Sequence, residues 1–168
     1  IPDSVTTIES NAFVNCTKIP GLALGGNLLS IGSNAFQNCT SIGTLNIPVS
    51  VSSIGDYAFE RCQSITSTLT IAGSIQTIGS YAFRYCYKLP AIVLGGNLLS
   101  IGLQSFQNCT SLGRLNIPVS VSSIGYNAFS GCKSITSALT IAGNMQTIGA
   151  YAFNDCSKLP SVSLGGNS

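Results

Sequence analysis

The chain has 168 residues, of which only 7% are charged, against about 25% in typical soluble proteins. Its 45% hydrophobic content excludes an intrinsically disordered chain, and a formal net charge of +2 excludes a strongly basic nucleic-acid-binding surface. Histidine is absent, which removes the commonest general base and metal ligand, and no apolar run is long enough to span a membrane.

A repeat of 23 or 24 residues dominates the sequence. An isoleucine lies five residues before each phenylalanine, and a cysteine lies three residues after it. Repeats of this length cannot bury their own apolar face, so we expect seven units to stack as coils whose buried side chains form continuous ladders. The expected ladder residues are Phe13, Phe36, Phe59, Phe83, Phe106, Phe129, Phe153, Cys16, Cys39, Cys62, Cys86, Cys109, Cys132 and Cys156.

Each repeat divides into three segments in chain order. Alternating apolar residues, as in Leu45-Asn46-Ile47 and Leu69-Thr70-Ile71, predict a short parallel strand. The following Val/Leu-x-x-Ile-Gly segment is expected to bring the chain back across the core, and its glycine suggests a positive φ or a close backbone approach. The Ala-Phe-x-x-Cys segment favours a single helical or 3₁₀ turn. The 24-residue units carry their extra residue just before a strand, between Ile65 and Leu69 or Ile135 and Leu139.

A longer repeat overlies the short one, because residues 20–89 and 90–159 match at about 50 of 70 positions. We call these segments the first and second super-repeats. The sequence therefore predicts one solenoid domain over residues 1–168. Since the chain begins with Ile1 rather than methionine, we expect it to be part of a longer repeat array.

The motif Ile-Pro, Val-x-x-Ile-Gly, Ala-Phe-x-x-Cys and Leu/Ile resembles the BspA-like subgroup of the leucine-rich repeat superfamily. Residues 47–65 and 117–135 match it throughout, and the resemblance covers essentially the whole chain. It implies a leucine-rich repeat solenoid with a parallel β-sheet on the concave face and short turns and loops on the convex side. It also implies surface proteins that act in adhesion to host proteins or other cells.

No enzymatic chemistry is indicated. Asp56 and Glu60 are the only closely spaced carboxylates, and their equivalents in the second super-repeat are Tyr126 and Ser130. Serine has no histidine partner for nucleophilic catalysis. One cysteine per coil does not supply a closed metal-ligand set, so we expect small buried hydrophobic residues, although neighbouring coils could approach disulfide distance. We predict no catalytic residue, metal, cofactor or small-molecule substrate.

Binding surfaces are expected at outward strand positions, where side chains are small and mostly uncharged. The alternative is a ladder of Thr and Asn that only supports the sheet. The candidates are Thr44, Asn46, Thr68, Thr70, Val93, Arg114, Asn116, Thr140, Ser161 and Ser163. Six tyrosines near the Ala-Phe turns, beginning with Tyr57, offer a second patch or merely cover the turn. Asn-Cys-Thr sequons at Asn15, Asn38 and Asn108 are glycosylation candidates or simply turn residues.

Two functional hypotheses follow. The first is a non-enzymatic adhesion or protein-binding module, secreted or at a cell surface, whose partner is a host or cell-surface protein. The second is a structural protein whose copies stack end to end into a filament, including a cytoplasmic assembly, because open parallel edges pair readily and 7% charge gives little repulsion. Neither hypothesis involves nucleic acid or a membrane-spanning segment.

Overall fold

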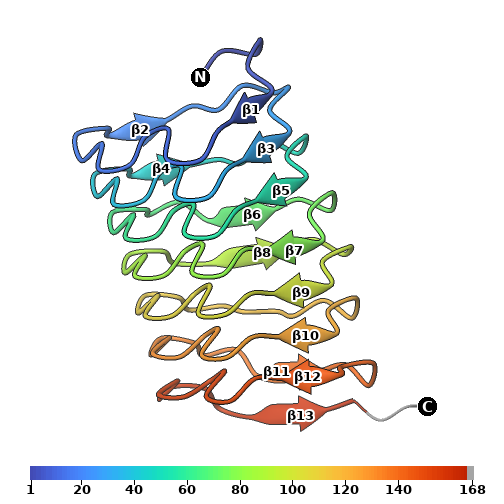
Figure 1. The fold of residues 1–168 in the computed structure, drawn as a ribbon. Helices are drawn as coiled ribbons and strands as arrows, with labels where there is room; N and C mark the ends of the chain where they lie inside the picture. Colours follow the sequence, from blue (N-terminus) through green and yellow to red (C-terminus); the bar gives the residue numbers. More distant parts are fainter. Residues whose placement is uncertain (166–168) are drawn as a thin grey trace.

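The computed structural model describes residues 1–165, and in this range the chain forms a stack of parallel coils built from 13 short strands and turns (Figure 1). We number the coils 1 to 7 by their phenylalanines. The predicted solenoid is confirmed. One strand from every coil joins a seven-stranded parallel sheet in the order β1 (Thr7–Ile8), β3 (Ser30–Ile31), β5 (Ser53–Ile54), β7 (Thr77–Ile78), β9 (Ser100–Ile101), β10 (Ser123–Ile124) and β12 (Thr147–Ile148).

The remaining strands form three separate parallel pairs. They are β2 (Gly21–Leu22) with β4 (Thr44–Leu45), β6 (Leu69–Ile71) with β8 (Ile92–Leu94), and β11 (Leu139–Ile141) with β13 (Val162–Leu164). A single bridge between Ala91 and Arg114 extends the middle pair. The continuous sheet is therefore formed by the Ile-Gly segment, which we expected only to bring the chain back, while the predicted Leu-x-Ile strands form an interrupted surface.

The extra residue of the 24-residue units explains the interruptions. The Ser67 hydroxyl oxygen accepts a hydrogen bond from the Leu45 amide at 3.1 Å and donates to the Leu45 carbonyl at 3.1 Å. Ser137 binds Leu115 in the same way, at 3.1 and 3.0 Å. A serine side chain thus takes the place of the neighbouring strand, so the sheet stops once in each super-repeat.

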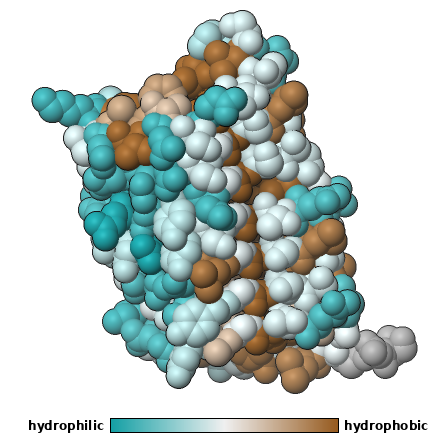
Figure 2. Space-filling model, in the orientation of Figure 1, coloured by the Kyte–Doolittle hydropathy of each residue, from teal (hydrophilic) through white to brown (hydrophobic). Residues whose placement is uncertain are grey.

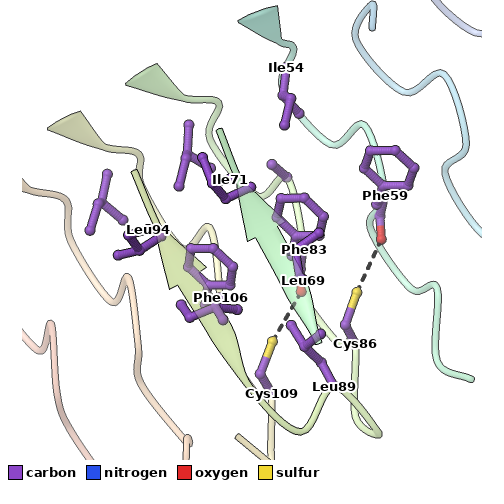
Figure 3. Packing of buried hydrophobic residues seen from close by; sticks show 14 of the residues in the cluster. Ile54, Phe59, Leu69, Ile71, Phe83, Cys86, Leu89, Leu94, Phe106 and Cys109 are labelled. Carbon is purple, nitrogen blue, oxygen red and sulfur yellow. Dashed lines mark hydrogen bonds between the residues drawn. The ribbon is translucent and has the colours of Figure 1, made fainter. Parts of the chain in front are cut away.

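The core is a column of stacked aromatic rings between the strands (Figure 3). Neighbouring Phe rings lie 5.1–5.4 Å apart and within 9° of parallel. The five inner rings are fully buried, whereas Phe13 and Phe153 are partly buried. Ile and Leu side chains from both strand types pack around this column, so each coil buries its apolar face only against its neighbours.

The glycine four residues before Phe marks a close approach between coils rather than a positive φ. A Cβ placed on Gly79 would lie 2.5 Å from the Gly55 carbonyl carbon, and one on Gly102 would lie 2.6 Å from the Ile78 carbonyl oxygen. Such distances exclude any side chain, because the obstacle is backbone that cannot move aside. The glycine column therefore sets the spacing of the stack.

The turns around each Phe have an unexpected backbone. Residues two before and two after every Phe have positive φ, for example Asn34 (56°) and Asn38 (60°) around Phe36. Successive backbone amides alternate in direction. The amides of Ala35, Gln37 and Cys39 donate to carbonyls within the turn, whereas those of Phe36 and Asn38 donate to carbonyls of the next coil. The predicted helical or 3₁₀ turn is not confirmed, because left-handed residues interrupt it and send every second amide to the following coil.

Candidate functional site

The outward side chains of the Leu-x-Ile strands, which we call the Leu-x-Ile face, share one exposed surface. All ten predicted binding residues are exposed there. Strand pairing places Thr70 opposite Val93 and Thr140 opposite Ser163. A shallow pocket of about 500 Å³ opens at the second sheet break, between Arg114, Asn116 and Ser137. The ten residues are small and mostly polar, with Arg114 as their single charged member.

A second surface runs along the turns, and we call it the turn ridge: the residues from three before to four after each Phe. Hydrophilic side chains (teal) gather along the left side of the stack in Figure 2. The ridge of coils 2–4 holds a buried carboxylate, since Glu60 is only 3% exposed. Gln37 donates to Glu60 Oε2 at 2.5 Å, and Arg84 donates to Oε1 from Nε at 2.9 Å. Three successive coils are thereby joined by one polar chain.

Aromatic rings hold this polar chain in place. The guanidinium carbon of Arg84 lies 4.6 Å from the Tyr81 ring centre and 4.9 Å from that of Tyr85. The Tyr57 ring stacks on the Tyr81 ring, with the ring centres 4.4 Å apart. Partial burial raises the pKa of Tyr57, and the neighbouring Tyr81 raises it further. Arg84 is therefore sandwiched between rings and paired with Glu60, which fixes its side chain and compensates its charge.

Beside this chain lies a polar pocket of about 380 Å³. It is lined by Asn15, Gln37, Asn38, Tyr57, Glu60, Arg61 and Arg84. The tyrosine patch and the Glu60 neighbourhood were noted in the sequence, but Gln37 and Arg84 were missed. The sequence does contain a signal for them, because Gln37, Glu60 and Arg84 each directly follow a Phe. This shared position brings the three side chains into one column across coils 2–4.

The structure also places the remaining candidates. Asp56 does not join Glu60, because its carboxylate accepts the Ser80 amide at 2.6 Å. The three sequon asparagines lie in the left-handed position after Phe, and Asn38 donates to the Asn15 side-chain oxygen at 2.8 Å. Asn15 is exposed, while Asn38 and Asn108 are half-buried.

All seven cysteines are free thiols; Cys16 and Cys156 are half-buried and the other five are buried. Each thiol from coil 2 onward donates to the Phe carbonyl of the preceding coil, as Cys86 does to Phe59 at 3.3 Å (Figure 3). Burial raises the pKa of these thiols, to about 11 for Cys156 and about 12 for Cys109. Residues 1–165 bring together no group of three or more His, Cys, Asp or Glu suited to a metal ion.

No helix in the described range is long and apolar enough to cross a membrane.

Comparison with known proteins agrees with this architecture. The chain is similar to the T. pallidum leucine-rich repeat protein, with 27% identity and a TM-score of 0.80 over 93% of this chain and 72% of that one. It is also similar to a leucine-rich cell surface protein from Faecalibacterium prausnitzii (25% identity, TM-score 0.73, 99% of this chain and 53% of that one) and to a leucine-rich repeat protein from Bacteroides ovatus (28%, 0.69, 99% and 48%). The chain spans about half the length of the latter two.

No curated protein matches the chain. The family model for the BspA type leucine-rich repeat region matches residues 1–89 and 76–168 in six copies. Such proteins are generally non-enzymatic protein-interaction modules and are typically surface or secreted. Because the family model covers the chain from end to end, the protein belongs to the BspA-type leucine-rich repeat family.

Proposed function

We propose that the chain is a non-enzymatic adhesion module that binds a host or cell-surface protein through the Leu-x-Ile face, outside the cell. The observation that carries the proposal is the exposure of the ten outward side chains on one surface. Protein binding is the common use of this solenoid family, and repeat solenoids present extended surfaces suited to it.

The chemistry of the face supports a protein partner. Thr, Ser and Asn side chains both donate and accept hydrogen bonds, and their short length costs little conformational entropy when they become fixed. Exposed Val93 adds apolar area to the same face. Arg114, which lines the hollow at the second sheet break, would supply the one charged contact.

The test is a binding screen against immobilised extracellular-matrix and cell-surface proteins, with Thr70→Arg and Asn116→Arg as blocking variants. Ser53→Arg is the matched control, because Ser53 is exposed on the other sheet. We expect a saturable partner whose binding falls at least tenfold in the two blocking variants and not in the control. A screen without a saturable partner, or equal loss in the control, would contradict the proposal.

End-to-end assembly is the second candidate, and one observation favours it. On the turn ridge, three amides of each of coils 1–6 donate forward to the next coil, as Asn34, Phe36 and Asn38 do to coil 3. A first coil and a last coil are therefore complementary, and either a further repeat or a second copy could continue the stack. Electron microscopy of the parent protein distinguishes the two, since filaments of several molecules support assembly and discrete particles contradict it.

A further inference from the structure

We propose that the turn ridge of coils 1–4 carries a binding site for a sugar acid, meaning a polyhydroxylated sugar unit that bears a carboxylate. Its centre is Arg61, at the polar pocket lined by Asn15, Asn38 and Tyr57. The site uses none of the residues of the Leu-x-Ile face, so it stands independently of the proposed protein binding.

The charges at the pocket leave one guanidinium without a close partner. Arg84 and Gln37 occupy the two oxygens of Glu60. Arg61 approaches that carboxylate only to 4.0 Å, beyond hydrogen-bond distance, and its side chain is 54% exposed. Two arginines therefore share one carboxylate, which leaves a net positive charge among the residues that line the pocket. A guanidinium presents a planar fork of donors that fits a carboxylate in bidentate fashion.

The backbone of Arg61 is held in place before any ligand binds. Its backbone is left-handed with φ of 60°, and its amide donates to the Arg84 carbonyl at 2.8 Å. Its guanidinium carbon lies 5.4 Å from the Tyr85 ring centre. The held backbone and the contact with Tyr85 reduce the entropy that Arg61 loses on binding, which favours a small ligand.

The neighbouring groups suit hydroxyls rather than further carboxylates. Asn38 uses one hydrogen of its amide nitrogen on Asn15, which leaves the Asn38 oxygen as an acceptor and N–H hydrogens of both residues as donors. Gln37 likewise donates to Glu60 and keeps its oxygen. Sugar hydroxyls both donate and accept, whereas an acidic peptide side chain offers acceptors alone. The mixed set around one cation therefore favours a sugar acid over an acidic peptide.

The second super-repeat contains a natural counterpart without the site. Gly131 stands at the position of Arg61, Ser130 at that of Glu60 and Asn154 at that of Arg84. The same fold thus presents a ridge that lacks the central guanidinium, and we expect it not to bind the ligand.

The probe is a short oligomer of galacturonic acid, titrated by calorimetry against the intact chain at low salt. Arg61→Asn is the test variant, because asparagine occupies this left-handed position in coils 1, 2 and 5. Lys133→Gln is the control, since it removes the same charge from an exposed side chain of coil 6. We expect saturable binding that weakens at least tenfold in Arg61→Asn and is unchanged in Lys133→Gln.

Two further ligands test whether binding needs both the carboxylate and the sugar hydroxyls. A neutral galactose oligomer is expected not to bind, and a glutamate peptide is expected to bind at least tenfold more weakly. Arg61→Lys, which keeps the charge without the fork, should give intermediate affinity, and it replaces Arg61→Asn if thermal melting shows that variant misfolded. Absence of uronate binding, equal binding of the neutral oligomer, tighter binding of the peptide, or an unaffected Arg61→Asn would each overturn the proposal.

Discussion

The two super-repeats share one core architecture and differ mainly on one surface. Of their 70 aligned positions about 20 differ, and about 12 of those lie within the turn ridge. The aligned rings of Phe59 and Phe129 are both fully buried and stack in the same way. The difference teaches that stacking constrains the buried columns, while the ridge can change its chemistry without changing the fold.

The polar column shows this most clearly. In coils 2–4 it is Gln37, Glu60 and Arg84, a charged and hydrogen-bonded chain. In coils 5–7 the same column is Gln107, Ser130 and Asn154, with no charge. The backbone beneath it is alike, since Asn38 and Asn108 donate to the carbonyls of Glu60 and Ser130 at 2.7 and 2.8 Å. Charge in the first super-repeat is therefore an addition to a complete scaffold.

Alkaline pH should produce the largest effect, and it should act on both super-repeats together, because each contains three thiols with raised pKa. The ordinary pKa is 9.0, and the folded values include about 11 and about 12. Above pH 9 the unfolded chain loses thiol protons that the folded chain keeps, so the free energy of unfolding falls as pH rises. The slope is about 1.4 kcal/mol per pH unit for each thiol that remains protonated only when folded.

Chemical denaturation between pH 8 and pH 11 measures this loss. Cys62→Ala and Cys132→Ala should flatten the dependence equally, since both thiols are fully buried. A pH-independent free energy of unfolding would contradict the buried-thiol column.

Phe59→Ala and Phe129→Ala should each lower the free energy of unfolding by about 3–5 kcal/mol, because each removes a fully buried ring between two stacked neighbours. Urea denaturation of the two variants provides the comparison. Losses that differ by more than about 1 kcal/mol would break the equivalence of the two cores, and losses below that value would mean that the rings do not support the stack.

Glu60→Ala should destabilise by about 2–4 kcal/mol, because it leaves Arg84 in a largely desolvated position without its carboxylate. The aligned change Ser130→Ala should cost less than about 0.5 kcal/mol. Glu60→Ala combined with Arg84→Asn, the residue found in coil 7, should recover most of the loss. Thermal or urea unfolding measures all three, and no recovery in the double variant would argue against a paired charge.

Ser67→Ala and Ser137→Ala should each cost about 1–3 kcal/mol, since each leaves the amide and carbonyl of a buried leucine without partners. The two losses should be alike, as the two sheet breaks are alike. Ser53→Ala is the control, because Ser53 lies outward on the continuous sheet. Comparable loss in the control would show that the serine bridge is not the cause.

The smallest effect concerns the residue before Phe. Ser105 is buried and its hydroxyl has no hydrogen-bond partner within residues 1–165, whereas the aligned residue is Ala35. Ser105→Ala should therefore raise the free energy of unfolding by about 1 kcal/mol, and Ala35→Ser should lower it by a similar amount. Differential scanning calorimetry of both variants measures the shift, and a lower melting temperature for Ser105→Ala would contradict the assignment.

Much of the architecture could be predicted because buried columns follow the period of the repeat. Phe59, Cys62 and Ile65 recur at fixed spacing, and fixed spacing in stacked coils means vertical contact. The helical turn is not confirmed, because residues on both sides of each Phe have positive φ. Asn is enriched in that backbone region, but Tyr and Arg at the same positions carry no such signal.

The position of the continuous sheet could not be predicted from the sequence either. Two-residue strands such as Ser53–Ile54 are too short for an alternating pattern, so only the inter-coil hydrogen bonds define them. The candidate site illustrates the same limit. Glu60 and Arg84 lie 24 residues apart, and their pairing depends on the 24-residue unit that brings both to one column.

The forward-facing amides of the turn ridge have a consequence for how such a protein changes length. Every coil offers the same amide donors to the coil that follows it, and the serine bridge occurs once per super-repeat. Adding or removing 70 residues therefore preserves the spacing of both the amide hydrogen bonds and the serine bridges. Adding 23 residues would move the bridge out of step with the strands that it interrupts. We therefore expect a solenoid of this kind to gain or lose coils in steps of three.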